Sequence, residues 1–509
     1  MPRFPSCCAL FVATLLRCGL ARADPYHQQT LPLGQRAVGM AGAFTAVADD
    51  PSATYYNPAG LVLTNDLALS ASLTLQAFDR STVAGGYRTN VGKASLNHST
   101  GTSLPTFISA IKLLGRHGDD GRRRHAVGLS TFTVSQRDVS YDVETRGPTT
   151  TLPRLETLQV KHTERTVWYG ASYAYRVNER ISLGLSNFFS LSRSSYSEAR
   201  LSADEGALNP DGSSASDNNS FDGRDGKTNV KSLLWRIGVL YAYSPRLQFG
   251  LMVQTASVHL RGTASVRDRS LITHGATAPV SSVFNQSESH LTSHNPTPWE
   301  VRLGSRYALY SWLTLAIDAA LYGPSGSKSR PVVTIGPRSV DPETNAAPQI
   351  GALQTDSYYR HWNGNVSIGA SAVLPRTVRL RAGLYTDLSS APRIPSSSAR
   401  YYDPDVHRIG ATVAVGLQSE GFDIALGMIG LAGLGHAMAF NTDPDLDQRY
   451  QRTRATDRMF LLFVNGVKSA ISTLAKHAET GLMKIKGKLA DEPEPRDEPA
   501  SSSPEQATE

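Results

Sequence analysis

An alternation of apolar and polar residues recurs along much of this 509-residue chain. From Ile181 to Leu191 the odd positions are mainly apolar, and the positions between them are mainly small or polar. A period of two places successive side chains on opposite faces of a strand, so such a stretch predicts a strand with one apolar face. The pattern recurs at residues 166–177, 232–243 and 313–321. We therefore expect a fold built mainly from strands.

The apolar faces of these strands carry no charged residue. A lysine or arginine that faces lipid at the middle of a bilayer costs roughly 2 to 4 kcal/mol, whereas a strand face in water would accept it freely. Lipid is therefore the favoured neighbour of the apolar faces. A soluble β-sandwich alternates in the same way, so the alternation alone leaves both architectures open.

The lengths of the connections distinguish the two architectures. Fourteen segments fit strands, and the connections between them alternate between short and long. The short connections include 178–180, 244–246 and 375–377, and the long polar ones include 202–229, 262–295 and 323–361. Outer-membrane barrels combine short periplasmic turns with long external loops and an even number of strands. The sequence thus predicts an all-β fold, a 14-stranded antiparallel transmembrane β-barrel at residues 67–466 in the bacterial outer membrane, with both termini in the periplasm.

The first 23 residues have the features of a secretory signal peptide. Arg3 provides a basic start, an apolar centre follows, and small residues at Ala21 and Ala23 mark a cleavage site. All three cysteines lie within residues 1–23, so the mature chain from Asp24 has no thiol for a disulfide or a zinc site. Loss of three arginines lowers the formal charge from +7 to +4, which argues against nucleic acid as the main partner. No motif predicts a cofactor.

A segment rich in glycine and alanine, from Gly34 to Leu61, lies between the signal peptide and the first strand. Residues 24–66 are too few to form a core of their own. Asp50 followed by Pro51 predicts a helix start, and a short helix is expected to run to Tyr56. Small residues permit close packing of backbones. We therefore expect residues 24–66 to form a plug whose missing contacts are supplied by the lumen of the barrel.

The sequence GQRAVGMAGAFTAVADDPSATYYNPAGL resembles the N-terminal signature of the FadL/TodX family of outer-membrane channels for hydrophobic compounds. The resemblance implies a fourteen-stranded barrel plugged by this segment, which is called the hatch. It also implies a fatty acid or aromatic ligand that leaves the lumen sideways, after the hatch shifts, beside a kinked third strand. The strand that begins near His125, with Gly128, is the candidate for the kink. The residues that match the signature and are expected to shape the hatch and its hinge are Gly39, Gly42, Asp49, Asp50, Asn57, Pro58 and Ala59.

Two of these residues also have a simpler interpretation. Asn57 and Asp50 belong to the residue types that commonly cap helices, so they can equally serve only as caps. The sequence leaves both interpretations open.

The predicted lumen face includes apolar side chains, which favours a passage for hydrophobic compounds over an ion channel. Arginines on this face either bind a carboxylate or pair with other wall charges. The uncharged run from Ile424 to Phe440 contains too many glycines for a transmembrane helix, and we expect a strand that leads into an apolar external loop. The part from Met428 to Phe440 is expected to bind ligand there or to pack on the plug or on neighbouring loops. The candidate ligand contacts are Trp168, Phe188, Arg236, Arg302, Arg306, Met428 and Phe440.

The C-terminal region departs from the family pattern. Residues 467–490 repeat apolar side chains at helical spacing among lysines, which predicts an amphipathic periplasmic helix. Such a helix either lies on the inner leaflet, docks a periplasmic partner or packs only weakly. Residues 491–509 have the composition of a disordered acidic tail rich in proline and serine.

The leading hypothesis is a channel for uptake of hydrophobic small molecules, either long-chain fatty acids or aromatic hydrocarbons. The alternative is a non-transporting barrel scaffold that holds a periplasmic or surface partner. A barrel-borne lipid-modifying enzyme fits less well, because the 13 histidines are scattered and no nucleophile motif is present. In each case we expect a monomeric barrel surrounded by outer-membrane lipid, without a cofactor, a metal or a nucleic-acid partner.

Overall fold

The computed structural model describes residues 26–64, 68–89, 92–117, 123–146, 154–204, 219–273, 281–334, 354–374, 377–398, 402–419, 422–441 and 450–468. The predicted signal peptide at 1–23 and the predicted tail at 491–509 lie outside these residues. The predicted helix at 467–490 also lies outside them, except that Val467 and Lys468 belong to the last strand.

Strands make up most of the described chain. The longer strands are β1 (Ala68–Arg88), β2 (Lys93–His117), β3 (Arg123–Arg146), β4 (Arg154–Arg176), β5 (Ile181–Asp204), β6 (Asn219–Ala242), β8 (Val258–Thr273), β17 (Asp405–Ser419), β18 (Phe422–Asn441) and β19 (Tyr450–Lys468). The shorter ones are β7 (Leu247–Gln254), β9 (Ser281–Thr292), β10 (Glu300–Tyr310), β11 (Leu313–Tyr322), β12 (Ser325–Thr334), β13 (Gln354–Arg360), β14 (Asn363–Val373), β15 (Val378–Asp387) and β16 (Ser397–Ser398).

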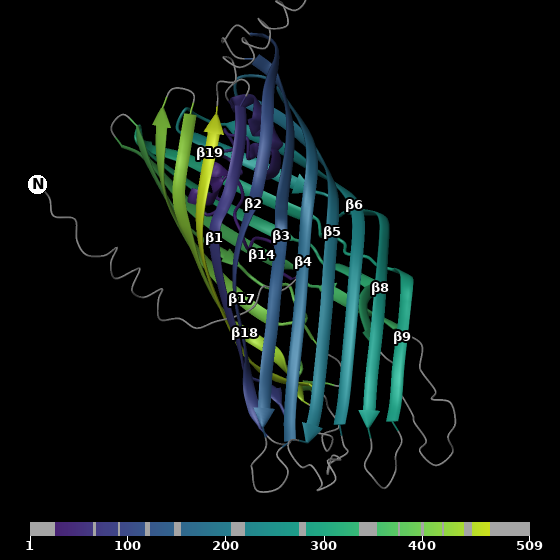
Figure 1. Cartoon of the computed structure of the whole chain (residues 1–509). Coiled ribbons are helices and arrows are strands. Elements are labelled where there is room, and N and C mark those ends of the chain that lie inside the picture. The colour runs from purple at the N-terminus through teal and green to yellow at the C-terminus, as the bar shows by residue number, and fades with distance from the viewer. Residues whose placement is uncertain are drawn as a thin grey trace, which may run out of the picture. The chain divides into compact units, whose positions relative to one another are not determined.

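The main sheet closes on itself to form a β-barrel (Figure 1). From β1 the antiparallel neighbours follow in the order β2, β3, β4, β5, β6, β7, β10, β11, β14, β15, β17, β18 and β19, and β19 pairs with β1. A short parallel pairing joins Tyr87 and Arg88 of β1 to Phe440 and Asn441 of β18. Closure removes the free edges that an open sheet would expose.

The described residues form nineteen strands rather than the fourteen predicted segments. β8 and β9 fall largely within the predicted loop at 262–295, and β12 and β13 lie within the predicted loop at 323–361. The loop prediction is wrong there, and it is wrong for the start of β6 at Asn219. Strands that are polar on both faces give no apolar period to detect, although pairing with neighbours satisfies their backbone groups.

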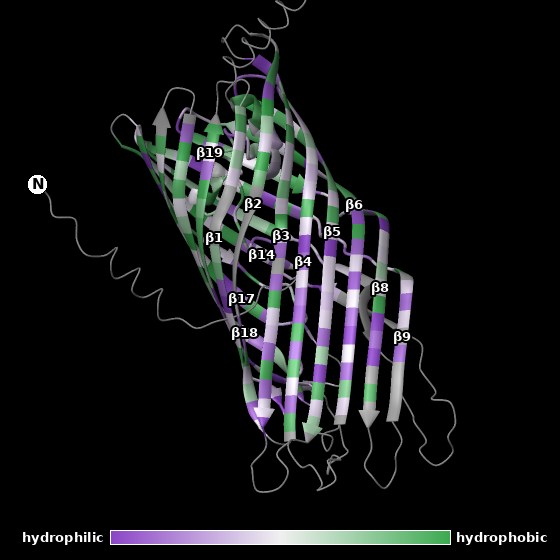
Figure 2. Ribbon diagram, viewed as in Figure 1, coloured by the Kyte–Doolittle hydropathy of each residue, from purple (hydrophilic) through white to green (hydrophobic). Residues whose placement is uncertain are grey.

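Side chains alternate between the two faces of the wall. On β5, Leu183 and Leu185 are 43% and 46% exposed, whereas Ser186 and Phe188 are completely buried. Figure 2 shows this alternation as stripes of apolar and polar colour along the strands. Large exposed apolar side chains on a closed barrel indicate an outer face in contact with lipid. No helix within the described residues is long and apolar enough to cross a membrane.

The segment before β1 lies inside the barrel, and we call residues 26–64 the hatch segment (Figure 1). It contains α2 (Gln35–Gly39), α3 (Ala53–Tyr56) and the 3-10 helix η1 (Pro58–Leu63). η1 contacts β3 to β6, whereas α2 contacts β15, β17, β18 and β19. Because these strands occupy different parts of the ring, the hatch segment must run across the lumen.

The predicted helix start at Asp50 and Pro51 is displaced. Helix α3 begins at Ala53 with Ser52 as its N-cap, and no side chain caps it. The Oδ1 atom of Asp50 instead accepts a hydrogen bond from the Ser52 amide at 2.7 Å. The helix ends at Tyr56, as expected, because Asn57 is extended and is followed by Pro58.

The run from Met428 to Phe440 is part of β18 and is not an external loop. Met428 is 45% exposed on the outer face, whereas Ile429 is buried on the inner face. Two glycines of this run permit close packing inside the wall. A Cβ added at Gly433 would lie 2.8 Å from the Cγ atom of Arg408 on β17, and one added at Gly435 would overlap the backbone of Asp405. At these two positions glycine therefore reflects close contact between strands and not a loop.

Candidate functional site

Asn57 connects the hatch segment to the wall. Its Nδ2 atom donates to the carbonyl oxygen of Thr45 at 2.9 Å and to that of Val239 on β6 at 3.0 Å. Its Oδ1 atom accepts from the amide of Ala59 at 3.2 Å, which caps η1. The side chain is completely buried, so both amide donors are used where water cannot replace them. Asn57 is therefore a cap and an anchor at once.

Pro58 and Ala59 rest on two glycines of the wall. A Cβ added at Gly184 of β5 would overlap the backbone of both residues, and one added at Gly238 of β6 would overlap Asn57. Gly184 and Gly238 are directly paired in the ladder between β5 and β6. Because neither carries a side chain, the wall is recessed where η1 contacts it.

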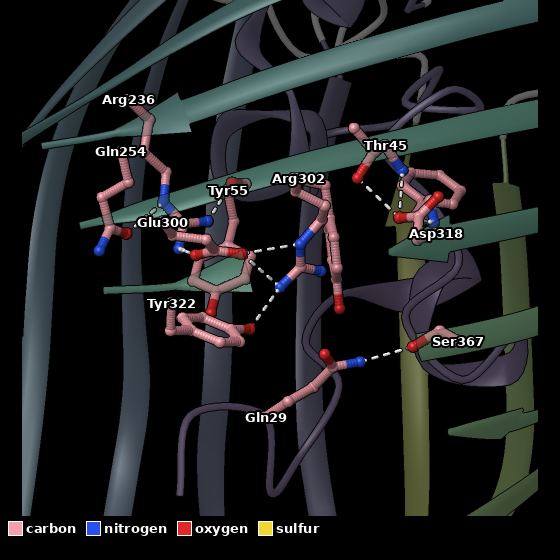
Figure 3. Close-up of polar contacts among 12 residues, drawn as sticks. Gln29, Thr45, Tyr55, Arg236, Gln254, Glu300, Arg302, Asp318, Tyr322 and Ser367 are labelled. Atoms are coloured by element: carbon pink, nitrogen blue, oxygen red, sulfur yellow. Dashed lines mark hydrogen bonds and ion pairs between the residues drawn. The ribbon is translucent and has the colours of Figure 1, made fainter. Parts of the chain in front are cut away.

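Asp318 on β11 provides a second anchor for the hatch segment (Figure 3). Its Oδ2 atom accepts from the amides of Phe44 and Thr45 at 3.0 and 2.9 Å, and from the Thr45 hydroxyl at 2.6 Å. One carboxyl oxygen of the wall thus accepts three hydrogen bonds from the hatch segment. Gln29 adds a further contact, because its Nε2 donates to the hydroxyl of Ser367 on β14 at 2.6 Å.

Asp49 and Asp50 act within the hatch segment. Asp49 forms an ion pair with Arg36, and Asp50 accepts from the Arg36 amide at 3.3 Å. Burial raises the pKa of the Asp50 carboxyl, and the charge of Arg36 and the hydrogen bond from Ser52 oppose that shift. These contacts join α2 to the turn before α3 and so maintain the shape of the segment.

The two signature glycines have distinct roles. Gly42 has a φ of 81°, a backbone conformation that residues with a Cβ rarely adopt. Gly39 lies against the wall, where an added Cβ would approach the Cβ of Arg381 on β15 to 2.9 Å. Its carbonyl oxygen accepts from the Thr412 hydroxyl on β17 at 3.1 Å. One glycine therefore permits a turn, and the other permits close contact.

Two arginines and one glutamate form a buried cluster on the lumen face (Figure 3). Arg236 on β6 donates to Glu300 at 3.1 Å, and Arg302 on β10 donates to the other oxygen of Glu300 at 2.8 Å. Gln254 accepts from Arg236 at 2.8 Å, and the Tyr322 hydroxyl accepts from Arg302 at 3.0 Å. The sequence left two roles open for these arginines, which were binding a carboxylate ligand and pairing with a charge on the wall. The geometry shows pairing with the wall residue Glu300.

Aromatic rings lie next to this cluster. The centroids of Trp168 and Phe188 are 5.4 Å apart, and Tyr55 of the hatch segment lies 5.2 Å from Phe132. The guanidinium carbon of Arg236 lies 3.9 Å from the centroid of the Tyr55 ring, a cation–π contact. Tyr55 thus stands between the ionic cluster and the aromatic wall.

A cavity of about 80 Å³ lies between the hatch segment and the wall. Its lining includes Tyr55, Trp168, Arg236, Glu300, Val134 and Ser135. A water molecule occupies about 30 Å³ in the liquid, so the cavity has room for a small molecule or for one end of a larger one.

The third strand is irregular beside this cavity. Its pairing with β4 shifts register between Thr133 and Ser135, so Val134 is an extra residue in β3. Gly128, the predicted site of the kink, lies in a regular part of the ladder opposite Ile111 and Ser172. The predicted strand is therefore right, but its irregularity lies at the bulge, because an extra residue bends a strand more than a paired glycine does.

The backbone ladder between β2 and β3 ends at the same level. Their ladder ends at the pair Phe107 and Phe132, and no backbone pairing joins them beyond it in the stretches that the structure describes. An outer groove of about 360 Å³ lies where this ladder ends, and Thr133 contributes to its lining. Val134 and Ser135 line the inner cavity, so the bulge separates the cavity from the groove.

The remaining predicted contacts lie away from the cavity. Arg306 donates to Gln248 at 3.4 Å near a short turn, and Met428 lies on the outer face. Phe440 belongs to a buried cluster with Tyr87 and Tyr141.

Glu300, Tyr55 and Val134 also line the cavity, although the sequence patterns do not single them out. Glu300 precedes Arg302 by two residues, so both side chains lie on the same face of the strand. This spacing was the only local indication in the sequence that Glu300 faces the lumen. Nothing local marks Tyr55 or the bulge.

A family model described as outer membrane protein transport protein (OMPP1/FadL/TodX) matches residues 27–412, more than half of the chain. The chain belongs to this family. As a FadL/TodX family member it is an outer-membrane transport channel for hydrophobic compounds, as the resemblance of the hatch signature predicted.

Solved structures share the fold of this family member. A FadL homologue from Pseudomonas aeruginosa has a TM-score of 0.54 at 13% identity, covering 89% of this chain and 100% of that one. The toluene transporter TodX from P. putida has a TM-score of 0.53 at 13% identity, covering 86% and 98%. A comparison with curated proteins found no match.

Proposed function

We propose that this FadL/TodX family member takes up a fatty acid or an aromatic hydrocarbon by binding it in the lumen and releasing it sideways through the wall at β3. The hatch segment acts as the gate, and its shift admits the ligand. In this proposal the wall of the barrel consists of fourteen strands. β7 and β8 both pair with β6 and act as one interrupted strand, and β9 and β10 act as the next one. The name of the P. putida relative, a toluene transporter, agrees with cargo of this kind.

The position of the bulge carries the proposal. Val134 and Ser135 border the cavity inside, and Thr133 borders the groove outside, so two or three residues of one strand separate lumen and lipid. β2 offers no backbone partner to this part of β3 among the described residues. A strand that pairs on one side only moves at lower cost than one paired on both sides.

The cavity lining suits a ligand with an apolar body. Trp168 and Tyr55 provide ring faces, and Arg236 retains hydrogen-bonding capacity beside them. A fatty acid would place its carboxylate near Arg236, whereas an aromatic hydrocarbon would use the rings alone. The two cargo classes therefore depend differently on this arginine.

Deletion of Val134 tests lateral release, because it restores a regular register in β3. Uptake of radiolabelled oleate and toluene is measured in cells that lack other transporters of these compounds. We expect the deletion to lower uptake of the true cargo about tenfold or more. The control Val134→Ala keeps the extra residue and is expected to retain uptake. Unchanged uptake after the deletion, with the protein folded in the membrane, would contradict lateral release.

A truncation after Lys468 separates the channel from the scaffold alternative. The channel proposal predicts that uptake survives loss of residues 469–509, since the cavity, the hatch segment and the bulge lie before them. If the full-length protein supports no uptake and the truncation only releases a bound partner, the scaffold alternative gains.

A further inference from the structure

The outer face of β4, β5 and β6 has an apolar band of defined height. On β4 the outward residues from Val167 to Tyr175 are apolar or aromatic, and the corresponding ranges are 181–191 on β5, apart from Asn187, and 233–243 on β6 and the turn after it. These ranges span nine, eleven and eleven residues. A tilted transmembrane strand needs about 9–11 residues, so the band matches the hydrocarbon layer.

Cations mark the end of the band that lies away from the short turns. Arg165 and Arg193 are directly paired between β4 and β5, and Lys231 and Arg261 are directly paired between β6 and β8. Directly paired residues share one face of a sheet, and all four side chains are exposed. Arg193 lies opposite Asn229, two residues from Lys231, which makes the two pairs diagonal neighbours. Four adjacent strands thus present one belt of positive charge.

No ion pair neutralises the belt within the part of the chain that the structure describes. Like charges placed directly opposite each other destabilise a sheet. Across the described residues none of the four cations forms an ion pair, and Arg165 has only the Thr133 hydroxyl as a polar partner, at 3.5 Å. Asp138 of β3 lies on the same face, opposite Thr163, but no ion pair joins it to Arg165 within the described residues. Lys227, opposite Ser195, adds a further positive charge. An external anion would relieve this repulsion.

An apolar groove adjoins the arginine pair. The outer groove of about 360 Å³ is lined by Arg165 and Arg193 together with Val167, Tyr169 and Leu191. It therefore combines two guanidinium groups with apolar side chains from the edge of the hydrocarbon band. This combination matches an amphiphile with an anionic head and an alkyl chain.

We propose that the belt and the groove bind the phosphorylated glycolipid of the outer leaflet, lipid A. A phosphate is held between Arg165 and Arg193, whose guanidinium groups form paired hydrogen bonds with phosphate oxygens. An acyl chain lies in the groove against Tyr169 and Leu191. Short turns are periplasmic in such barrels, so the opposite end of the band is the level at which outer-leaflet phosphates lie. The site is separate from the lumen, and it does not depend on which cargo the channel carries.

Binding of fluorescent, bisphosphorylated lipid A to the purified full-length protein in nonionic detergent tests the proposal. The double variant Arg165→Gln/Arg193→Gln is expected to bind about tenfold more weakly or worse. The matched control Arg180→Gln/Arg246→Gln removes two exposed arginines from short turns and is expected to change binding less than about twofold. Lipid A without phosphates is expected to bind the unaltered protein weakly. Its affinity should match that of bisphosphorylated lipid A for the double variant.

Three results would overturn the proposal: equal binding of phosphorylated and dephosphorylated lipid A, full binding by the double variant, or displacement of lipid A by oleate but not by pyrophosphate. The last result would identify the groove as an exit site for carboxylate cargo. The heat-dependent gel shift of folded barrels reports whether each variant is folded. If the glutamine variant is unfolded, the double variant Arg165→Lys/Arg193→Lys is used in its place. Lysine keeps the positive charge but cannot form the paired hydrogen bonds of arginine, so this variant is expected to bind lipid A more weakly than the unaltered protein.

Discussion

His98 on β2 reaches Ser140 on β3, and its Nδ1 atom lies 3.0 Å from both the amide nitrogen and the carbonyl oxygen of Ser140. The contact lies beyond the last backbone pair of the two strands, Phe107 and Phe132. The buried imidazole also packs edge-on against Tyr141, with centroids 6.2 Å apart. A side chain therefore bridges two strands where the ladder between them has ended.

Replacing His98 by alanine is expected to loosen β3 beyond the bulge. One net hydrogen bond contributes about 0.5–1.5 kcal/mol, so amide hydrogen exchange near Ser140 should become several-fold faster, about two- to tenfold. His162→Ala is the matched control, because His162 contacts Ser194 at 3.1 Å within a continuous ladder. Equal acceleration near Ser140 in both variants would show that His98 does not bridge the strands.

A methyl group at Gly184 is expected to displace the hatch segment. The added Cβ would overlap the backbone of Pro58, which no side-chain rotation relieves. Overpacking of this kind costs about 1–3 kcal/mol, and urea unfolding in detergent measures it as a lower midpoint. Gly466→Ala is the control, since nothing lies within 4 Å of its added Cβ, and its effect should stay within about 0.5 kcal/mol. A larger loss for Gly466→Ala would contradict this packing.

Asn57→Ala removes the anchor between η1 and β6. The carbonyl groups of Thr45 and Val239 lose their side-chain donor in a buried site, which costs about 1–3 kcal/mol. We expect a less firmly held hatch segment and a higher ion conductance in planar lipid bilayers. Asn178→Ala is the control, because Asn178 caps an exposed turn with its Oδ1 at 2.8 Å from two amides. If both variants conduct like the unaltered protein, Asn57 is only a cap.

Glu300→Gln leaves two buried guanidinium groups without their shared carboxylate. Breaking a buried ion pair from one side costs about 3–5 kcal/mol, so unfolding in urea should occur at a much lower concentration. Glu144→Gln is the control, because its pair with Arg146 is exposed and contributes about 0–1 kcal/mol. Similar midpoints for the two variants would mean that the neutral partners, Gln254, Tyr322 and the carbonyl group of Tyr55, are enough to hold the arginines in place.

The sequence alone determined the strand character and the lipid-facing side of the wall. Alternation with period two is a local property, and the cost of a charge in lipid keeps one face apolar, so a single strand such as 181–191 already carries the information. The hatch signature is also contained in one continuous stretch, residues 34–61. It predicted the FadL/TodX family, which the family model confirms. Strands with polar residues on both faces lack such a signal, which is why β8, β9, β12 and β13 were predicted as loops.

Only the tertiary structure decided which groups meet in the lumen. Arg236 and Glu300 are 64 residues apart, and Thr45 and Asp318 are 273 residues apart, so no local pattern links them. The bulge at Val134 likewise depends on the register that β3 adopts against β4, and the buried side of Phe440 depends on closure of the barrel. Periodicity sets which face a side chain points to, whereas its partner is set by long-range pairing of strands.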